Sequence, residues 1–183
     1  VVQSRLHPPI AVVFSPDGKR MVTVSIEKFA RIRDSATGEL VGVLRGHKRA
    51  LLSVAYGRNG RIATGDVGGT VKIWDATTQR ELHSLTGHVS RVFSIQFDRT
   101  GQRLLTTDPL GPPRVWDATS GAPLLVLSEA SSGTLSAVFS PSGSQIAAAA
   151  MDGLLRVWDV RSGRLLREWR SRSTGGTGLA YSP

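Results

Sequence analysis

The chain has no cysteine, so disulfide bonds and thiolate chemistry are both excluded. This absence fits the reducing cytoplasm, which is the expected location. No apolar run approaches the roughly 18 residues that a membrane-spanning helix requires, so we expect no membrane insertion. Residue 1 is Val and no basic, apolar leader follows it, so the start is interpreted as an interior cut or a processed end.

Acidic residues are also scarce. The chain has 14 Asp and Glu against 23 Lys and Arg, of which 19 are Arg, and its formal net charge is +9. This excess of positive charge favours an anionic partner, such as nucleic acid or an acidic protein. The simpler alternative is a solvated basic surface, because the charges are spread along the chain and not gathered in blocks.

Residue combinations that perform catalysis or hold metals are missing as well. The histidines are few and scattered: His7, His47, His83 and His88. There is no His-Glu-x-x-His, Gly-x-Ser-x-Gly or Walker-type motif. The glycine-rich stretch 65–69 is interpreted as a turn between strands, because a phosphate cradle requires a strand followed by a helix. The sequence therefore predicts no enzyme activity, no catalytic residues, no metal site and no cofactor.

What the chain does have is a repeat. A segment that ends in Trp74-Asp75 returns at Trp116-Asp117 and Trp158-Asp159, and a degenerate copy ends at Asp34. The four closing aspartates are 41, 42 and 42 residues apart. A period of about 40–45 residues ending in Trp-Asp is typical of the four-stranded blade of a β-propeller.

A second marker keeps the same period. The turn sequence Phe-Ser-Pro-Asp-Gly at 14–18 has counterparts at 56–60, 97–101 and 139–143 and begins again at Tyr181. Short apolar segments with β propensity lie between the markers, and none has a convincing helical pattern. The predicted fold class is all-β, with four complete four-stranded antiparallel blades at approximately 10–44, 51–85, 92–127 and 134–169.

Together these features resemble the WD40-repeat β-propeller family. Its Gly-His dipeptide is matched by Gly46-His47 and Gly87-His88, each nine residues before the aromatic residue of the next turn marker. The resemblance covers essentially the whole chain, 1–183. The wording of the motifs is more similar to bacterial than to eukaryotic WD40 domains.

The resemblance implies a buried polar tetrad in each blade: His from the Gly-His loop, Ser or Thr on the second strand, Asp before the third strand, and the Trp. The matching residues are His47, Thr64, Trp74, His88, Thr106, Trp116, Asp152 and Trp158. Departures from the pattern are Gly68, Leu110 and Glu27 at the Asp position, Ala130 and Ala148 in the fourth repeat, and Arg33 for the first Trp. No blade is expected to hold a full set, which predicts modest stability.

The two ends predict incomplete blades. Residues 1–3 align with a fourth strand and residues 177–183 with a first strand. Propellers close with about four to eight blades, and blades bury their faces only against neighbours. The chain is therefore interpreted as a segment of a larger propeller, closed by other blades of the same parent chain. A closed small ring and closure by a second copy are the alternatives.

The resemblance also implies a binding surface, because loops after Gly-His and turns before the third strand gather on one face. The mapped residues are Phe93, Met151, Leu52, Leu135 and Val67, with Arg49 and Arg91 around them. An apolar centre with a basic rim predicts a protein or peptide partner that carries acidic residues. The alternative is that these side chains only close the mouth of the channel.

The predicted function is a non-enzymatic protein–protein interaction scaffold or sensor domain. Similar bacterial domains sit in larger signalling proteins such as STAND-type NTPases, which implies a parent of that kind. The alternative is binding of nucleic acid or another polyanion through an arginine-rich outer edge at Arg164, Arg167 and Arg170. Those arginines are equally typical of the charged guard on an exposed edge strand.

Overall fold

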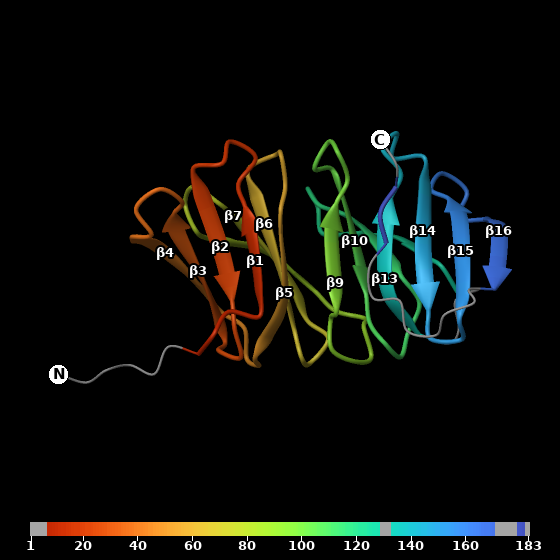
Figure 1. The fold of residues 1–183 in the computed structure, drawn as a ribbon, viewed down its shortest axis with the longest axis horizontal. Coiled ribbons are helices and arrows are strands. Elements are labelled where there is room, and N and C mark those ends of the chain that lie inside the picture. The colour runs from red at the N-terminus through yellow and green to blue at the C-terminus, as the bar shows by residue number, and fades with distance from the viewer. Residues whose placement is uncertain (1–6, 129–132, 171–178, 182–183) are drawn as a thin grey trace.

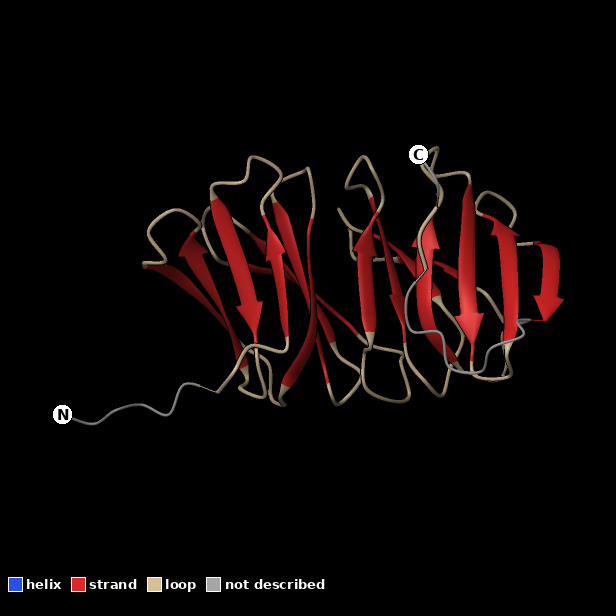
Figure 2. Cartoon of the chain, in the orientation of Figure 1, coloured by secondary structure: helices blue, strands red, loops and turns tan. Residues whose placement is uncertain are grey.

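The computed structural model describes residues 7–128, 133–170 and 179–181. In these ranges every regular element is a β-strand (Figure 2). No helix among them is long and apolar enough to cross a membrane. The strands at 1–3 and 177–183 that the sequence predicted fall mostly outside the described residues; residues 179–181 are described and are not in a strand.

The strands form four separate antiparallel sheets of four (Figure 1). Blade 1 contains β1 (Ala11–Phe14), β2 (Arg20–Val24), β3 (Phe29–Asp34) and β4 (Leu40–Arg45). Blade 2 contains β5 (Leu51–Tyr56), β6 (Arg61–Asp66), β7 (Val71–Asp75) and β8 (Glu81–Leu85). Blade 3 contains β9 (Ser94–Phe97), β10 (Arg103–Thr107), β11 (Arg114–Asp117) and β12 (Pro123–Val126). Blade 4 contains β13 (Thr134–Phe139), β14 (Gln145–Ala150), β15 (Leu154–Asp159) and β16 (Leu165–Arg170).

In every blade the strands pair in chain order, so each blade is a simple meander. The Trp-Asp motif ends the third strand, and its aspartate organises the turn to the fourth. Asp75 Oδ1 accepts from the backbone N–H groups of Thr77 at 2.9 Å and Thr78 at 2.6 Å. These bonds lower the pKa of Asp75. The all-β propeller class predicted from the sequence is confirmed.

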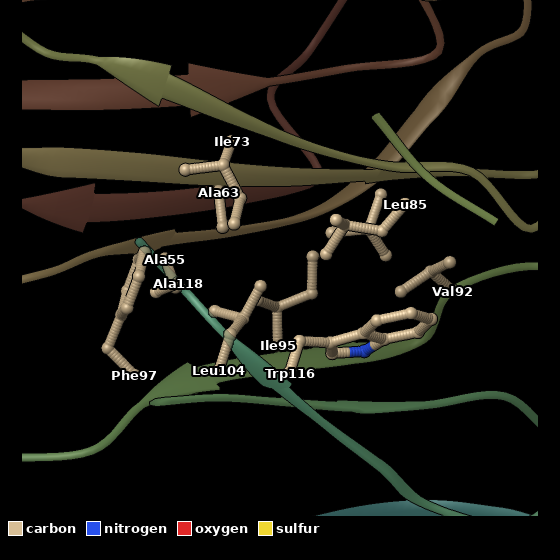
Figure 3. Close-up of a cluster of buried hydrophobic side chains, with 11 residues drawn as sticks. Ala55, Ala63, Ile73, Leu85, Val92, Ile95, Phe97, Leu104, Trp116 and Ala118 are labelled. Atoms are coloured by element: carbon tan, nitrogen blue, oxygen red, sulfur yellow. The ribbon is translucent and has the colours of Figure 1, made fainter. Parts of the chain in front are cut away.

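The core lies between the blades. Between blades 2 and 3, Ala63 and Ile73 face Ile95, Leu104 and Trp116 (Figure 3). Equivalent buried clusters join blade 1 to blade 2 and blade 3 to blade 4. Because each sheet buries apolar side chains on a neighbouring sheet, hydrophobic burial between blades is the main force that holds the row together.

The four blades form an open arc. Blade 1 and blade 4 lie at opposite ends of the molecule in Figure 1, and the first strands of neighbouring blades lie side by side. A cavity of about 630 Å³ follows these first strands and is lined by residues that include Val13, Val54, Ile95 and Phe139. Because blades 1 and 4 are the two ends of the row, no other blade in the described ranges covers the outer face of either one.

Candidate binding site

Two sets of loops meet at one edge of the sheets. Each first strand begins where the second strand ends, as the pairing of Leu51 with Asp66 shows in blade 2. The fourth strand ends at the same edge, because Leu85 pairs with Val71 at the start of β7. We call this edge the tetrad edge. It lies along the lower side of Figure 1, where β2 and β14 end.

A buried polar network lies behind the tetrad edge in blade 2. His47 Nε2 is 2.8 Å from Thr64 Oγ1, and Trp74 Nε1 donates to the same oxygen at 2.8 Å. His47 Nδ1 is 2.8 Å from Asp66 Oδ2. All four side chains are buried. Each polar group therefore depends on the others for a hydrogen-bond partner.

The hydrogen bonds assign the protons in this network. The carboxylate of Asp66 accepts, so His47 Nδ1 carries the proton, and Nε2 accepts from the hydroxyl of Thr64. The other carboxylate oxygen, Asp66 Oδ1, accepts from the N–H groups of Gly68 at 2.8 Å and Thr70 at 3.0 Å. Burial alone would raise the pKa of Asp66, but these hydrogen bonds, with that from His47 the strongest, hold it below its ordinary value.

Blade 3 repeats the network. His88 Nδ1 is 2.6 Å from Asp108 Oδ2, His88 Nε2 is 2.7 Å from Thr106 Oγ1, and Trp116 Nε1 donates to Thr106 Oγ1 at 2.8 Å. Burial lowers the pKa of His88, and the bond to Asp108 only partly opposes this. A neutral His88 fits the role of Nε2 as the acceptor from the Thr106 hydroxyl.

The tetrad aspartates lie two residues before Gly68 and Leu110, the positions expected from the sequence, so that expectation is wrong. The aspartates are Asp66, which ends β6, and Asp108, which follows β10. Blades 2 and 3 therefore hold full sets, so the reason for expecting modest stability is removed. A sequence signal was available: each aspartate follows the network threonine by two residues, a spacing that puts both side chains on one face of a strand.

The glycine of each Gly-His pair fits the same network. Gly46 has φ 154° and Gly87 has φ 138°, conformations that favour glycine. A Cβ at Gly46 would lie 3.2 Å from the ring of Trp74, and one at Gly87 would lie 3.6 Å from the ring of Trp116. The absence of a side chain at this glycine thus lets the loop pack close to the Trp ring and place the histidine beside it.

Blade 4 holds a different polar cluster. Ala148 stands at the position of the threonine, and Ala130 lies outside the described residues. Asp152 Oδ2 accepts from Arg156 Nη2 at 2.8 Å, so Asp152 forms an ion pair where a tetrad role was predicted. Glu168 Oε2 accepts from Arg156 Nε at 2.7 Å.

Trp158 packs in the apolar core between blades 3 and 4, where it is fully buried. Blade 1 resembles blade 4, because Glu27 pairs with Arg31 through two hydrogen bonds, one of 3.1 Å from Arg31 Nη2. Its residue at the Trp position, Arg33, donates to the carbonyl of Gly38 at 2.8 Å. In blade 1, His7 lies near Glu27 and lines a small cavity with Arg31.

Three of the predicted partner-binding side chains are exposed at the tetrad edge. Met151 is 59% exposed, and Phe93 and Val67 are each 40% exposed. Leu52 and Leu135 are half-buried at the β-bulges near the start of β5 and β13. Phe93, Met151 and Val67 therefore supply most of the apolar surface in this set.

Two exposed arginines accompany these side chains. The guanidinium of Arg91 lies 6.0 Å from the centre of the Phe93 ring. Arg49 crosses Gly68, where a Cβ would lie 2.6 Å from Arg49 Cδ. Neither arginine forms an ion pair with another residue in the ranges that the structure describes. Both cations are therefore available to an anionic partner.

A cavity of about 270 Å³ opens beside Arg49, and we call it the blade-2 pocket. Its charged walls are Lys48, Arg49, Lys72 and Asp66. The hydroxyl-bearing residues Thr70, Ser84 and Thr86 and the glycines Gly46 and Gly68 complete the lining. Hydroxyl and cationic donors that converge on one cavity favour an anionic ligand.

The predicted polyanion-binding arginines do not share one face. Arg167 pairs in register with Val157 and Arg170 with Leu154, so they project from opposite faces of β16. Arg164 precedes this strand, in the turn that follows Asp159. The outer edge is thus basic on both sides. No cluster of three or more acidic or histidine side chains able to hold a metal ion occurs among the described residues.

A profile of the WD40 family, "WD domain, G-beta repeat", matches residues 38–75, 79–109 and 121–159. The curated relatives include WD repeat-containing protein 55 of Mus musculus, 32% identical over 97 residues that cover 52% of this chain and 25% of the relative. Dynein assembly factor with WD repeat domains 1 of Xenopus laevis is 34% identical over 95 residues, which cover 51% of this chain and 23% of the relative. The chain thus spans about a quarter of each.

Among solved structures, the computationally designed Ika8 protein superposes with a TM-score of 0.84 at 26% identity. The match covers 94% of this chain and 52% of that chain. The two relatives named above are vertebrate proteins, so they do not support the bacterial character that the motif wording indicated.

Proposed function

Because the chain belongs to the WD40-repeat family, we propose that it is a non-enzymatic scaffold that binds a protein or peptide at the tetrad edge. The observation that supports this most is the exposure of Phe93, Met151 and Val67 along the tetrad edge, where Arg91 lies 6.0 Å from the Phe93 ring and, like Arg49, makes no ion pair within the described ranges. Aromatic, Met and Arg side chains are enriched at protein interfaces. A partner with apolar anchors and acidic residues fits this surface.

The wider context is also a proposal. We propose that these four blades belong to a larger propeller, because the apolar faces at both ends of the arc need neighbouring blades. A sensor role in a bacterial STAND-type NTPase rests on motif wording alone. A cytoplasmic location rests on the cysteine-free composition.

The alternative is polyanion binding through Arg164, Arg167 and Arg170. Arg167 and Arg170 lie on opposite faces of β16 and Arg164 lies in the turn before it, which supports this alternative less well than a single basic face would. Retention on heparin that falls steeply with salt, and that is lost when all three arginines are changed to Glu, is the result expected from this alternative.

A binding experiment tests the main proposal. A panel of acidic and neutral peptides with apolar anchors is screened by fluorescence polarisation against the full chain. For peptides that bind, Phe93→Ala and Met151→Ala should each raise the dissociation constant about tenfold or more. Leu124→Ala is the matched control, because Leu124 is 48% exposed but lies on the outer strand β12. Unchanged affinity in both edge variants would remove the tetrad edge as the site.

A further inference from the structure

A cation recurs at one position of every third strand. Arg31, Lys72, Arg114 and Arg156 each stand two residues before the Trp position, and each pairs across with the second strand at the level of the network threonine. The side chains of Lys72 and Arg156 are only 11% and 7% exposed. A cation this buried needs an anionic partner close by.

Blades 1 and 4 supply that partner from the turn before the third strand. Glu27 binds Arg31, and Asp152 binds Arg156; each acid stands four residues before its cation. In blade 4 a second acid, Glu168, lies opposite Arg156 on β16. Two carboxylates therefore surround Arg156.

In blade 2 the position four residues before the cation is a glycine, and the position opposite the cation on the fourth strand is a serine. Gly68 stands four residues before Lys72, and Ser84 lies opposite Lys72 on β8. The blade-2 pocket is lined by both. The blade-2 pocket thus lies at the position that Asp152 and Glu168 fill in blade 4.

The cations around this pocket keep unused hydrogen-bond donors. Lys72 Nζ donates to Glu81 at 2.6 Å and to Ser84 at 3.3 Å, which leaves one of its three N–H groups. Arg49 makes no ion pair within the described ranges. Two carboxylates lie near these cations, and both already have partners. Asp66 accepts hydrogen bonds from His47 and from the backbone of the turn, and Glu81 pairs with Lys72.

We propose that the blade-2 pocket binds an oxyanion, the phosphate monoester or carboxylate of a partner side chain, in the place that Asp152 and Glu168 occupy in blade 4. Arg49 and the remaining Lys72 donor bind the oxygens, and the hydroxyls of Thr70 and Ser84 add neutral donors. That the oxyanion belongs to a partner protein rests on the function proposed above. The affinity of the pocket for an anion does not.

Gly68 provides a direct way to fill the pocket from within. Its φ lies outside the left-handed region, so a side chain is compatible with the backbone. The closest atoms to a Cβ there are Cδ and Nε of Arg49, a flexible side chain that can move aside. Gly68→Asp therefore copies Asp152 and brings its own carboxylate to Lys72.

The test is a titration of the isotope-labelled full chain with sodium phosphate, and separately with sodium acetate, at constant ionic strength. The wild-type chain should show saturable shifts at the amides of Gly68, Thr70 and Ser84. Gly68→Asp should weaken phosphate binding at least tenfold, and Arg49→Gln should weaken it severalfold. Leu110→Asp is the matched control, because it makes the same charge change at the equivalent position of blade 3, and it should bind phosphate like the wild type.

Three outcomes would overturn the proposal: no localised shifts, unchanged binding by Gly68→Asp, or an equal loss in Leu110→Asp. Phosphate that binds more tightly than acetate identifies a phosphorylated residue as the ligand source. Equal binding identifies an acidic residue. No partner is used in this titration, so its result is independent of the peptide experiment with the Phe93 and Met151 variants.

Discussion

Blade 2 and blade 4 share one meander and one core position for Trp, yet their buried polar groups are satisfied differently. In blade 2 a histidine, a threonine and an aspartate form a chain that ends on Trp74, and the neighbouring Lys72 pairs with Glu81 and lines a pocket. In blade 4 the threonine position is Ala148, and Arg156 is enclosed by two carboxylates. The same backbone thus supports either a histidine-centred hydrogen-bond network beside a cation that lines a pocket, or a cluster in which two carboxylates bind the cation.

The difference teaches what each blade can do besides fold. In blade 4 the two carboxylates already occupy the space beside the cation, so an anionic ligand has no place there. In blade 2 the cation lines a pocket beside a hydrogen-bonded network, which offers a preorganised donor set. Four changes test this contrast.

The largest expected effect is in the histidine network of blade 2. Thr64→Val removes the acceptor of Trp74 Nε1 and the donor to His47, and leaves both buried groups unsatisfied, at a cost of about 3 kcal/mol. Urea denaturation measures this loss. Thr106→Val should behave alike in blade 3. Thr107, which follows Thr106, is the control. It is also fully buried, and its hydroxyl has no hydrogen-bond partner among the described residues, so Thr107→Val should be neutral or stabilising.

The second effect is in the ion-pair cluster. Arg156→Met removes the cation that binds both Asp152 and Glu168. These carboxylates are 26% and 42% exposed and can regain water, so we expect a cost of about 2 kcal/mol, below that of breaking a fully buried pair. Arg167→Met on the exposed side of β16 is the control and should change stability by less than about 0.5 kcal/mol. Equal effects would mean that the cluster contributes nothing specific.

The third effect is a pH dependence that arises in blade 3. Burial lowers the pKa of His88, so below about pH 6.5 the unfolded chain binds a proton that the folded chain does not. Stability from this group is therefore complete above that pH and is lost as the pH falls toward the folded pKa. Denaturation midpoints at pH 7.5 and 5.5 should show the drop, and His88→Asn should flatten it. Hydrogen exchange should respond in β10 and not in β14; the reverse would contradict the assignment.

The smallest effect is a gain. Gly68→Asp gives Lys72 a second carboxylate besides Glu81, at the position that Asp152 holds in blade 4, and in phosphate-free buffer it should raise stability by up to about 0.5 kcal/mol. Added phosphate should then stabilise the wild-type chain and leave the variant unchanged. Thermal unfolding with and without phosphate measures both. A variant that phosphate stabilises as strongly as the wild type would show that the anion binds elsewhere.

Some of this site could be predicted from the sequence. The threonines and tryptophans of blades 2 and 3 were identified from motif positions, because a fixed period carries each residue to the same place in every blade. Asp66 and Asp108 were missed, because the aspartate was expected in the turn before the third strand, two residues later in the sequence. The blade-2 pocket could not be predicted at all. It depends on the smallness of Gly68 and Ser84, which come together only when two strands pair in register.

The sequence by itself determined the repeat, the order of strands in each blade and the all-β class, because alternation and turn chemistry are local properties of neighbouring residues. Only the tertiary structure decided which polar groups meet. Asp66 reaches His47 across 19 positions of chain, and Arg156 reaches Glu168 across 12, through strand pairings that include a register shift between Val157 and Trp158. Contacts of this kind depend on the path of the backbone at each strand end, and residue order alone does not specify that path.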